Sequence, residues 1–223
     1  IHDVAIQDLP VVMCLDRGGL VGEDGVTHHG VFDMAAFGAV PGLTIAAPMN
    51  EPELRNMMYT ALGSGHPFMI RYPRGHGEGL PWRGEKFETL PVGRGRRLRE
   101  GADVALLTVG TVGNAAARAA GRAAAEGVSV AHYDLRFVKP LDEALLDEVG
   151  RKFRRVVTVE DGSLRGGVGE AVAAFFNGRG YDVRVQRLGI GDEWVEHGTP
   201  GQLYALCGYD EEGILRALLD TRA

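Results

Sequence analysis

Short apolar runs alternate along this chain with segments of helical pattern, and this alternation constrains the fold more than any other feature. Continuously apolar runs are typical of strands buried on both faces, with helices as the crossover connections between them. The predicted strands cover residues 11–15, 43–47, 68–72, 104–109, 128–133, 156–159 and 183–188. The predicted helices cover residues 30–37, 50–62, 115–125, 141–149, 169–176, 200–206 and 211–219. Asn50 is predicted to cap the second of these helices, with Glu53 three positions on as its capping-box partner. The sequence therefore predicts an α/β fold built on parallel sheets.

A break in this pattern divides the chain. Residues 75–101 are rich in Gly, Pro, Arg and Glu, and they are too many for an ordinary α/β connection. We therefore expect two α/β units, residues 1–80 and 102–223, joined by a linker over residues 81–101. Residues 1–6 have the pattern of the middle of a helix and do not begin with Met. We expect the chain to begin inside a domain, as a piece of a longer protein.

Charge and hydropathy exclude some classes of partner. The net charge of −6 argues against a nucleic-acid partner, although it leaves room for a local anion site. No apolar run approaches the roughly 18 residues of a membrane span, and no secretory signal opens the chain, so we expect no membrane partner. Cys14 and Cys207 lie in separate apolar runs, and we expect both to be buried free thiols in the reducing cytoplasm.

The most informative segment is the loop over residues 16–33, where five glycines fall within the thirteen residues 18–30. Glycine loses the most backbone entropy on folding, so this density indicates a loop that bends sharply and approaches a ligand closely. The loop follows the strand at 11–15 and so lies at a carboxyl edge, where open α/β sheets bind ligands. We interpret it as an active-site loop.

Two arginines mark the same edge. Arg17 begins the loop, and Arg74 follows the strand at 68–72. In a parallel sheet both emerge at the carboxyl edge, and two guanidinium groups suit a phosphate dianion because each donates paired hydrogen bonds. The alternative is two surface arginines that pair with Asp16 or Glu23. With the glycine-rich loop beside them, we favour an anion site.

Asp24 and His28 lie four residues apart in the loop, and together a carboxylate and an imidazole can bind hydroxyls and pass a proton near neutral pH. A metal site made from these two with His29 and Asp33 has no recognised ligand spacing, so we expect no metal ligands. One of the two adjacent histidines is expected to be structural. The residues alone leave open which of them faces the site.

Two glycine clusters, residues 110–113 and 162–169, each follow a predicted strand and open a helix. Neither continues into a phosphate-loop or dinucleotide signature, so we interpret both as tight turns. Glu160, Asp161 and residues 192–194 end strands and are predicted to face a domain or subunit contact.

Residues 16–33, Asp-Arg-Gly-Gly-Leu-Val-Gly-Glu-Asp-Gly-Val-Thr-His-His-Gly-Val-Phe-Asp, and residues 71–75, Arg-Tyr-Pro-Arg-Gly, resemble the 1-deoxy-D-xylulose-5-phosphate synthases. These enzymes are thiamine-diphosphate-dependent relatives of transketolase. Residues 138–142 and 160–169 resemble the transketolase C-terminal domain, so the resemblance covers essentially the whole chain. It implies that residues 1–80 are the C-terminal part of a pyrimidine-binding domain and that residues 102–223 are a transketolase-like C-terminal domain.

The resemblance implies a transferase that condenses pyruvate with D-glyceraldehyde 3-phosphate to 1-deoxy-D-xylulose 5-phosphate and CO2. This reaction is the first step of the non-mevalonate isoprenoid pathway and also serves thiamine biosynthesis. By resemblance, Arg17 and Arg74 bind the phosphate of the acceptor. Asp24 and His28 are the implied catalytic residues, which orient the acceptor hydroxyl and the cofactor-bound intermediate.

The same resemblance implies thiamine diphosphate and Mg2+ as cofactors, held mainly by an N-terminal part of the same enzyme that precedes this segment. We therefore expect no cofactor-binding residues here, a cytoplasmic homodimer, and no activity from this chain alone. The alternatives are another transketolase-like enzyme, including a 2-oxoacid dehydrogenase β subunit, or a non-catalytic α/β module that binds a phosphorylated metabolite. A β subunit would carry its own cofactor-activating glutamate, for which the chain has no room before Pro10.

Overall fold

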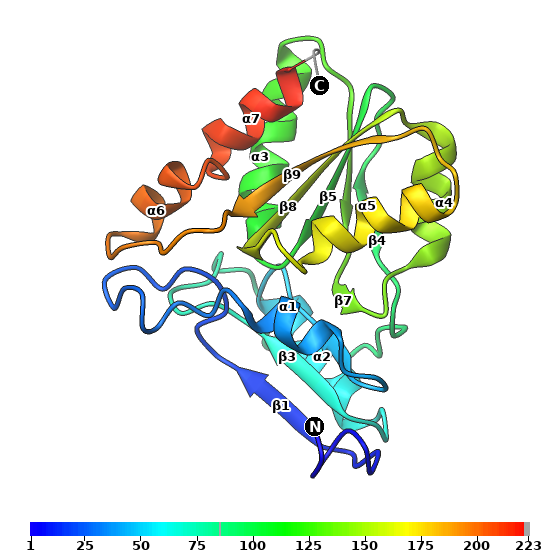
Figure 1. Cartoon of the computed structure of the whole chain (residues 1–223), viewed down its shortest axis with the longest axis vertical. Helices are drawn as coiled ribbons and strands as arrows, with labels where there is room; N and C mark the ends of the chain where they lie inside the picture. Colours follow the sequence, from blue (N-terminus) through cyan, green and yellow to red (C-terminus); the bar gives the residue numbers. More distant parts are fainter. Residues whose placement is uncertain (85, 221–223) are drawn as a thin grey trace.

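Each half of the chain forms its own sheet, and the two sheets lie end to end along the long axis of the molecule (Figure 1). The computed structural model describes residues 1–84 and 86–220. The first sheet has the order β1-β3-β2-β7. Its strands β1 (Val12–Leu15), β3 (Phe68–Arg71) and β2 (Thr44–Ala46) are parallel, whereas β7 (Phe137–Lys139) runs antiparallel to β2.

The second sheet has the order β4-β6-β5-β8-β9. Its four parallel strands are β6 (Val130–Asp134), β5 (Val104–Val109), β8 (Arg155–Ser163) and β9 (Arg184–Ile190). The short edge strand β4 (Arg96–Arg99) is antiparallel to β6. Both sheets are therefore mainly parallel with one antiparallel edge strand, and the predicted α/β class is confirmed.

Helices cover both faces of the second sheet, because its strands carry apolar side chains on both sides. In β5, Leu106 packs in the core formed with α3 (Val112–Ala125) and α7 (Glu211–Leu219), whereas Leu107 packs in the core formed with α4 (Glu143–Lys152) and α5 (Val168–Gly178). Near the first sheet lie α1 (Asp33–Gly38) and α2 (Glu51–Leu62), and α6 (Pro200–Leu206) precedes α7 (Figure 1). None of the helices in residues 1–84 and 86–220 has the length and apolar character needed to cross a bilayer.

Several local predictions differ from the structure. Residues 2–8 form successive turns rather than a helix, and α1 begins at Asp33 rather than at residue 30. Both cysteines are free, as predicted, but Cys14 is exposed because β1 is an edge strand, and Cys207 is only half-buried. The strand β4 lies within the segment predicted as a linker, residues 81–101. The proposed limits of the two domains stay a prediction.

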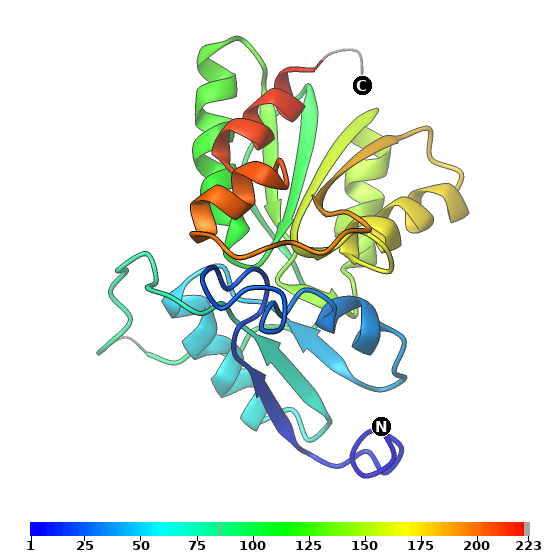
Figure 2. The ribbon, with the colours of Figure 1, turned by 60° about the vertical axis from the view of Figure 1, so that its left-hand side comes forward.

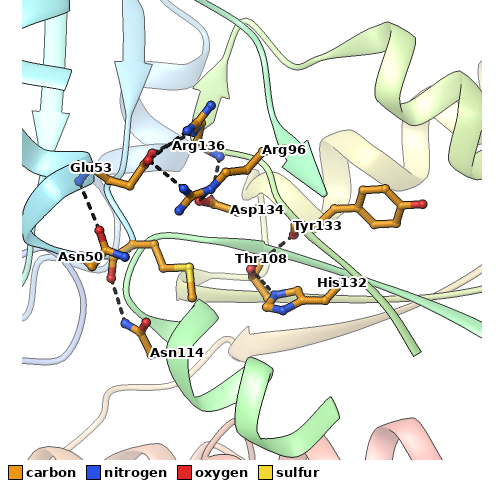
Figure 3. A network of polar contacts seen from close by, with 10 residues as sticks. Asn50, Glu53, Arg96, Thr108, Asn114, His132, Tyr133, Asp134 and Arg136 are labelled. Carbon is orange, nitrogen blue, oxygen red and sulfur yellow. Dashed lines mark hydrogen bonds and ion pairs between the residues drawn. The ribbon is translucent and has the colours of Figure 1, made fainter. Parts of the chain in front are cut away.

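Beside β7, a buried cluster of charged side chains joins the two halves of the chain (Figure 3). Asn50 caps α2 by accepting a hydrogen bond from the Glu53 amide at 3.1 Å, which confirms the predicted N-cap. The Glu53 carboxylate accepts two hydrogen bonds from Arg136, at 2.7 and 2.9 Å, and forms an ion pair with Arg96 at 2.8 Å. Arg96 also donates to Asp134 at 3.1 Å. We refer to Glu53, Arg96, Asp134 and Arg136 as the buried arginine cluster.

Candidate functional site

The glycine-rich loop, residues 16–32, is closed at its base by backbone hydrogen bonds. Gly19 and Gly30 exchange two N–H to C=O bonds, at 2.8 and 2.9 Å, and the Gly18 amide donates to the Tyr72 carbonyl at 2.9 Å. A Cβ atom on Gly30 would lie 2.1 Å from the Arg17 carbonyl oxygen, so only glycine fits there. These contacts hold the start of the loop against the end of β3, as the sheet-edge argument predicts.

Arg17, Asp24 and Arg74 meet at this edge. The Arg74 guanidinium donates to the Asp24 carboxylate, and Arg17 Nε lies 4.0 Å from the same carboxylate oxygen. Arg17 also donates to Asp16 at 2.7 Å, so the alternative surface pairing is present as well. Arg17 and Arg74 therefore converge as predicted, and in this structure they converge on a carboxylate of the chain itself.

Two features of Arg17 are energetically unfavourable. Its φ is +58°, in the left-handed region that is costly for a residue with a Cβ atom. Its Nε is shielded from solvent and has no hydrogen-bond partner among the residues that the structure describes. A shielded N–H group that lacks an acceptor can donate a hydrogen bond to an oxygen atom of a ligand.

The structure distinguishes the two histidines. The Val21 amide donates to His29 Nδ1 at 3.1 Å, which requires a neutral His29 with its proton on Nε2, the atom that lies 3.5 Å from the Glu196 carbonyl. Both ring nitrogens of His29 thus face atoms of the chain itself. His28 is exposed, and its Nδ1 lies 2.9 Å from the Thr27 hydroxyl.

A cavity of about 690 Å³ is lined by Arg74 and the segment after it, and by residues of helices α2, α3, α6 and α7. Glu51 lines it and holds the segment after Arg74 in place by accepting a hydrogen bond from the Gly79 amide at 2.7 Å. Backbone N–H groups, its own first and then that of Gly79, lower the pKa of Glu51. The ionised Glu51 thus fixes the path of the chain beyond Arg74.

The described residues do not form a metal centre, since no group of three or more His, Cys, Asp or Glu side chains in that part of the chain is placed to hold an ion. Asp33, one of the four residues considered for a metal, instead pairs with Arg71 at 2.6 Å.

Sequence analysis missed the part that Arg71 plays in supporting the loop. Arg71 is the only charged side chain in the buried strand β3, and that isolated charge was the available signal. Asp161 was predicted to face a domain or subunit contact, and it does: its carboxylate accepts a hydrogen bond from the Leu20 amide of the loop at 3.0 Å. Trp194, from the other segment predicted for such a contact, packs edge-on against Phe32, with ring centroids 6.0 Å apart.

Comparison with known families matches both halves of the chain. Residues 93–214 match the transketolase C-terminal domain, and residues 1–78 match the transketolase pyrimidine-binding domain. A solved structure of a split-gene transketolase, in an inactive β4 tetramer, superimposes with a TM-score of 0.85 at 27% identity, covering 96% of this chain and 68% of that one.

Individual relatives are more similar in sequence. The 1-deoxy-D-xylulose-5-phosphate synthase of Bacteroides fragilis is 58% identical over 224 residues, which is 100% of this chain and 34% of that protein. The enzyme of the same name from Bacteroides thetaiotaomicron is 57% identical, over 98% of this chain and 34% of its own length. The chain thus spans about a third of the length of these relatives. The resemblance predicted from the sequence is confirmed, and the chain belongs to the transketolase family, of which it contains a pyrimidine-binding segment and the C-terminal domain.

Proposed function

We propose that this chain is the acceptor-binding, C-terminal part of an enzyme that condenses pyruvate with D-glyceraldehyde 3-phosphate to 1-deoxy-D-xylulose 5-phosphate and CO2. The observation that carries the proposal is the convergence of Arg17 and Arg74 beside the glycine-rich loop. The names of relatives that are 57–58% identical over nearly the whole chain support the same reaction.

In this proposal the phosphate of the acceptor takes the place that the Asp24 carboxylate occupies between the two arginines. A phosphate dianion carries more charge and more acceptor oxygens than one carboxylate, so it competes well for the same donors. The Arg17 Nε, which lacks a hydrogen-bond partner within the described residues, gains one when the phosphate binds. Phosphate binding therefore releases Asp24 for a second task.

That second task is to orient the acceptor together with His28. The imidazole of His28 is exposed on the loop, and its Nδ1 is engaged by the Thr27 hydroxyl. We therefore assign Nε2 as the ring atom that contacts the acceptor hydroxyl and exchanges a proton with it. His29 has no part in this step, because its ring is bound to the Val21 amide.

Thiamine diphosphate and Mg2+ belong, in this proposal, to an N-terminal part of the enzyme, because the described residues form no metal centre. The partners are that N-terminal part, a second copy in a homodimer, and the two small substrates, in the cytoplasm. We propose that the chain is inactive by itself. A solved relative of similar fold, a split-gene transketolase, is likewise described as inactive in its β4 form.

Reconstitution tests the proposal. The chain is mixed with a matching N-terminal part, thiamine diphosphate, Mg2+, pyruvate and D-glyceraldehyde 3-phosphate, and product and CO2 are measured. We expect product only when both parts are present. A complete mixture that binds the cofactor but uses another acceptor would favour a different transketolase-like enzyme, and a chain that binds a phosphorylated metabolite without any companion would favour a binding module.

A further inference from the structure

The underside of the glycine-rich loop rests on the C-terminal domain, where Asp161 of β8 makes the central contact. Its Oδ1 accepts hydrogen bonds from the Leu20 amide at 3.0 Å and from the Tyr209 hydroxyl at 2.8 Å, and its Oδ2 accepts one from the Tyr204 hydroxyl at 3.2 Å. The side chain of Asp161 is buried. One carboxylate thus joins the loop to two tyrosines near the C-terminus of the chain.

Arg71 ties the far end of the loop to the same point. Its guanidinium donates to the Asp161 backbone carbonyl at 3.0 Å, to the Gly30 carbonyl at 3.1 Å and to the Asp33 carboxylate at 2.6 Å. Hydrogen bonds therefore connect both the beginning and the end of the loop to Asp161.

The backbone of the loop packs so closely against Asp161 that only glycine is accommodated at position 19. Gly19 has a φ of +88°, and a Cβ atom there would lie 1.9 Å from Asp161 Oδ2. Farther out, the Gly198 amide donates to the Gly22 carbonyl at 3.4 Å, where the loop passes the segment before α6 (Figure 2). The contact with Asp161 lies at the base of the loop, three residues from Arg17.

Burying a carboxylate between two domains costs free energy, because the charged group loses its hydration. Burial raises the pKa of Asp161, while Arg71 and then the Tyr209 hydroxyl act in the opposite direction. A well-packed apolar side chain in such a place commonly gives equal or greater stability. What an apolar side chain cannot do is accept the hydrogen bond of a backbone amide and so define the position of the loop.

We propose that Asp161 is a positioning residue of the acceptor site. By fixing the Leu20 amide, it sets where the Arg17 guanidinium stands relative to Arg74, so that the C-terminal domain determines the affinity for the phosphorylated acceptor. The identity of that acceptor rests on the proposed function, whereas the support of the loop by Asp161 does not.

The test uses the complete enzyme, this chain together with its N-terminal part, in the variants Asp161→Ala, Asp161→Asn and Tyr209→Phe. Tyr181→Phe is the matched control, because the Tyr181 hydroxyl donates to Asp147 at 2.9 Å on α4, away from the loop. The measurements are KM for each substrate, kcat, and hydrogen exchange of the amides in residues 16–33.

For Asp161→Ala we expect KM for D-glyceraldehyde 3-phosphate to rise about 5- to 30-fold, the equivalent of one or two lost hydrogen bonds. KM for pyruvate should stay within about twofold, and the loop amides should exchange faster. Asp161→Asn keeps an acceptor oxygen in the same place, so it should restore most of the affinity. Tyr209→Phe should fall between these two, and Tyr181→Phe should match the parent enzyme.

The outcomes separate this inference from the proposed function. If Arg74→Ala weakens use of the phosphorylated acceptor but Asp161→Ala does not, the positioning role is overturned and the proposed function stands. If Arg74→Ala has no such effect, the phosphate assignment is overturned, and hydrogen exchange alone decides: unchanged exchange of residues 16–33 in Asp161→Ala overturns the support of the loop. Should Asp161→Ala not fold, Tyr209→Phe carries the test, and a KM and loop exchange equal to those of Tyr181→Phe would overturn the inference.

Discussion

Two clusters in this molecule, each with two arginines around one carboxylate, differ in their exposure to solvent. Arg96 and Arg136 bind Glu53 in the buried arginine cluster, and Arg17 and Arg74 approach Asp24 at the glycine-rich loop. The Glu53 side chain is 7% exposed, whereas the Asp24 side chain is 31% exposed. Each cluster pairs one carboxylate with two guanidinium groups, but the two carboxylates differ in their exposure to solvent.

In the proposed function, that difference separates a structural use of charge from ligand binding. In the buried cluster, removing one arginine leaves the desolvated Glu53 carboxylate with only part of its compensation, which is costly. At the loop, water screens the charges and can replace either partner, so the ion pairs contribute little stability. Of the two carboxylates, we therefore expect Asp24 to be the one that a ligand displaces.

The largest effect is expected from breaking the buried cluster. Arg136→Ala removes both hydrogen bonds from Arg136 to Glu53 and should lower the free energy of unfolding by about 3–5 kcal/mol. Denaturant unfolding of the chain measures it. Arg154→Ala is the control, since Arg154 pairs with Asp182 on the surface and should change stability little. Equal losses in the two variants would contradict the distinction between the two kinds of cluster.

The next effect concerns Arg74 at the exposed cluster. In the complete enzyme, Arg74→Ala should reduce kcat/KM for D-glyceraldehyde 3-phosphate by about 1.5–3 kcal/mol, the scale of a hydrogen bond to a charged group. Use of an unphosphorylated aldehyde should hardly change, and neither should the thermal unfolding midpoint. Equal losses for both acceptors would mean that Arg74 does not read the phosphate.

At Asp24 we expect a smaller effect, and one that strengthens anion binding instead of weakening it. Asp24→Asn keeps the shape of the side chain but removes the charge that competes with a bound anion, so inorganic phosphate should bind about fivefold more tightly, or about 1 kcal/mol. Titration calorimetry measures this, with Asp16→Asn as the control at the neighbouring carboxylate. Weaker phosphate binding in Asp24→Asn would show that Asp24 helps to build the site rather than occupying it.

The smallest effect is the change of stability with pH that arises from Asp134 of the buried arginine cluster and its neighbour His132, because the contributions of these two groups have opposite signs. Burial raises the pKa of Asp134 to about 6, so the folded state binds more protons than the unfolded state and stability falls as pH rises from about 4 to 6. Burial lowers the pKa of His132 to about 4, so the unfolded state binds more protons and stability rises with pH between about 4 and 6.5.

Asp134→Asn removes one of these two contributions. Relative to the parent chain, the slope of stability against pH should be more positive in the variant between about pH 4 and 6, because a contribution that falls as pH rises has been removed. Unfolding free energies at a series of pH values give the slope, and His132→Asn should change it in the opposite sense. An unchanged slope in Asp134→Asn would mean that Asp134 is ionised throughout this range.

The sequence was sufficient wherever local pattern decides structure. The apolar run of β5 and the Asn50 cap of α2 are local signals, and the positions of Arg17 and Arg74 after parallel strands were enough to predict that they converge. Local pattern was not enough to predict how the two halves of the chain pair. The polar strand β4 and the three-residue strand β7 have no apolar periodicity, since each is specified by the strand that it pairs with.

The same limit applies at the site. His28 and His29 are adjacent and identical in type, and only the Val21 amide, brought close by the turn of the loop, distinguishes them. Glu53 could be identified as a helix-capping partner, but its side chain turns to Arg136, which lies 83 residues away along the chain. Contacts of this range are specified by the fold as a whole.

The strand β7 has a consequence for any attempt to divide this chain. It is contributed by the second half of the sequence, yet it covers the outer edge of β2 in the first sheet. A protein cut within residues 81–101 would leave β2, with its buried Ile45 and Ala46, open to pairing with other molecules, a condition that promotes aggregation. The two halves are therefore expected to need expression as one chain.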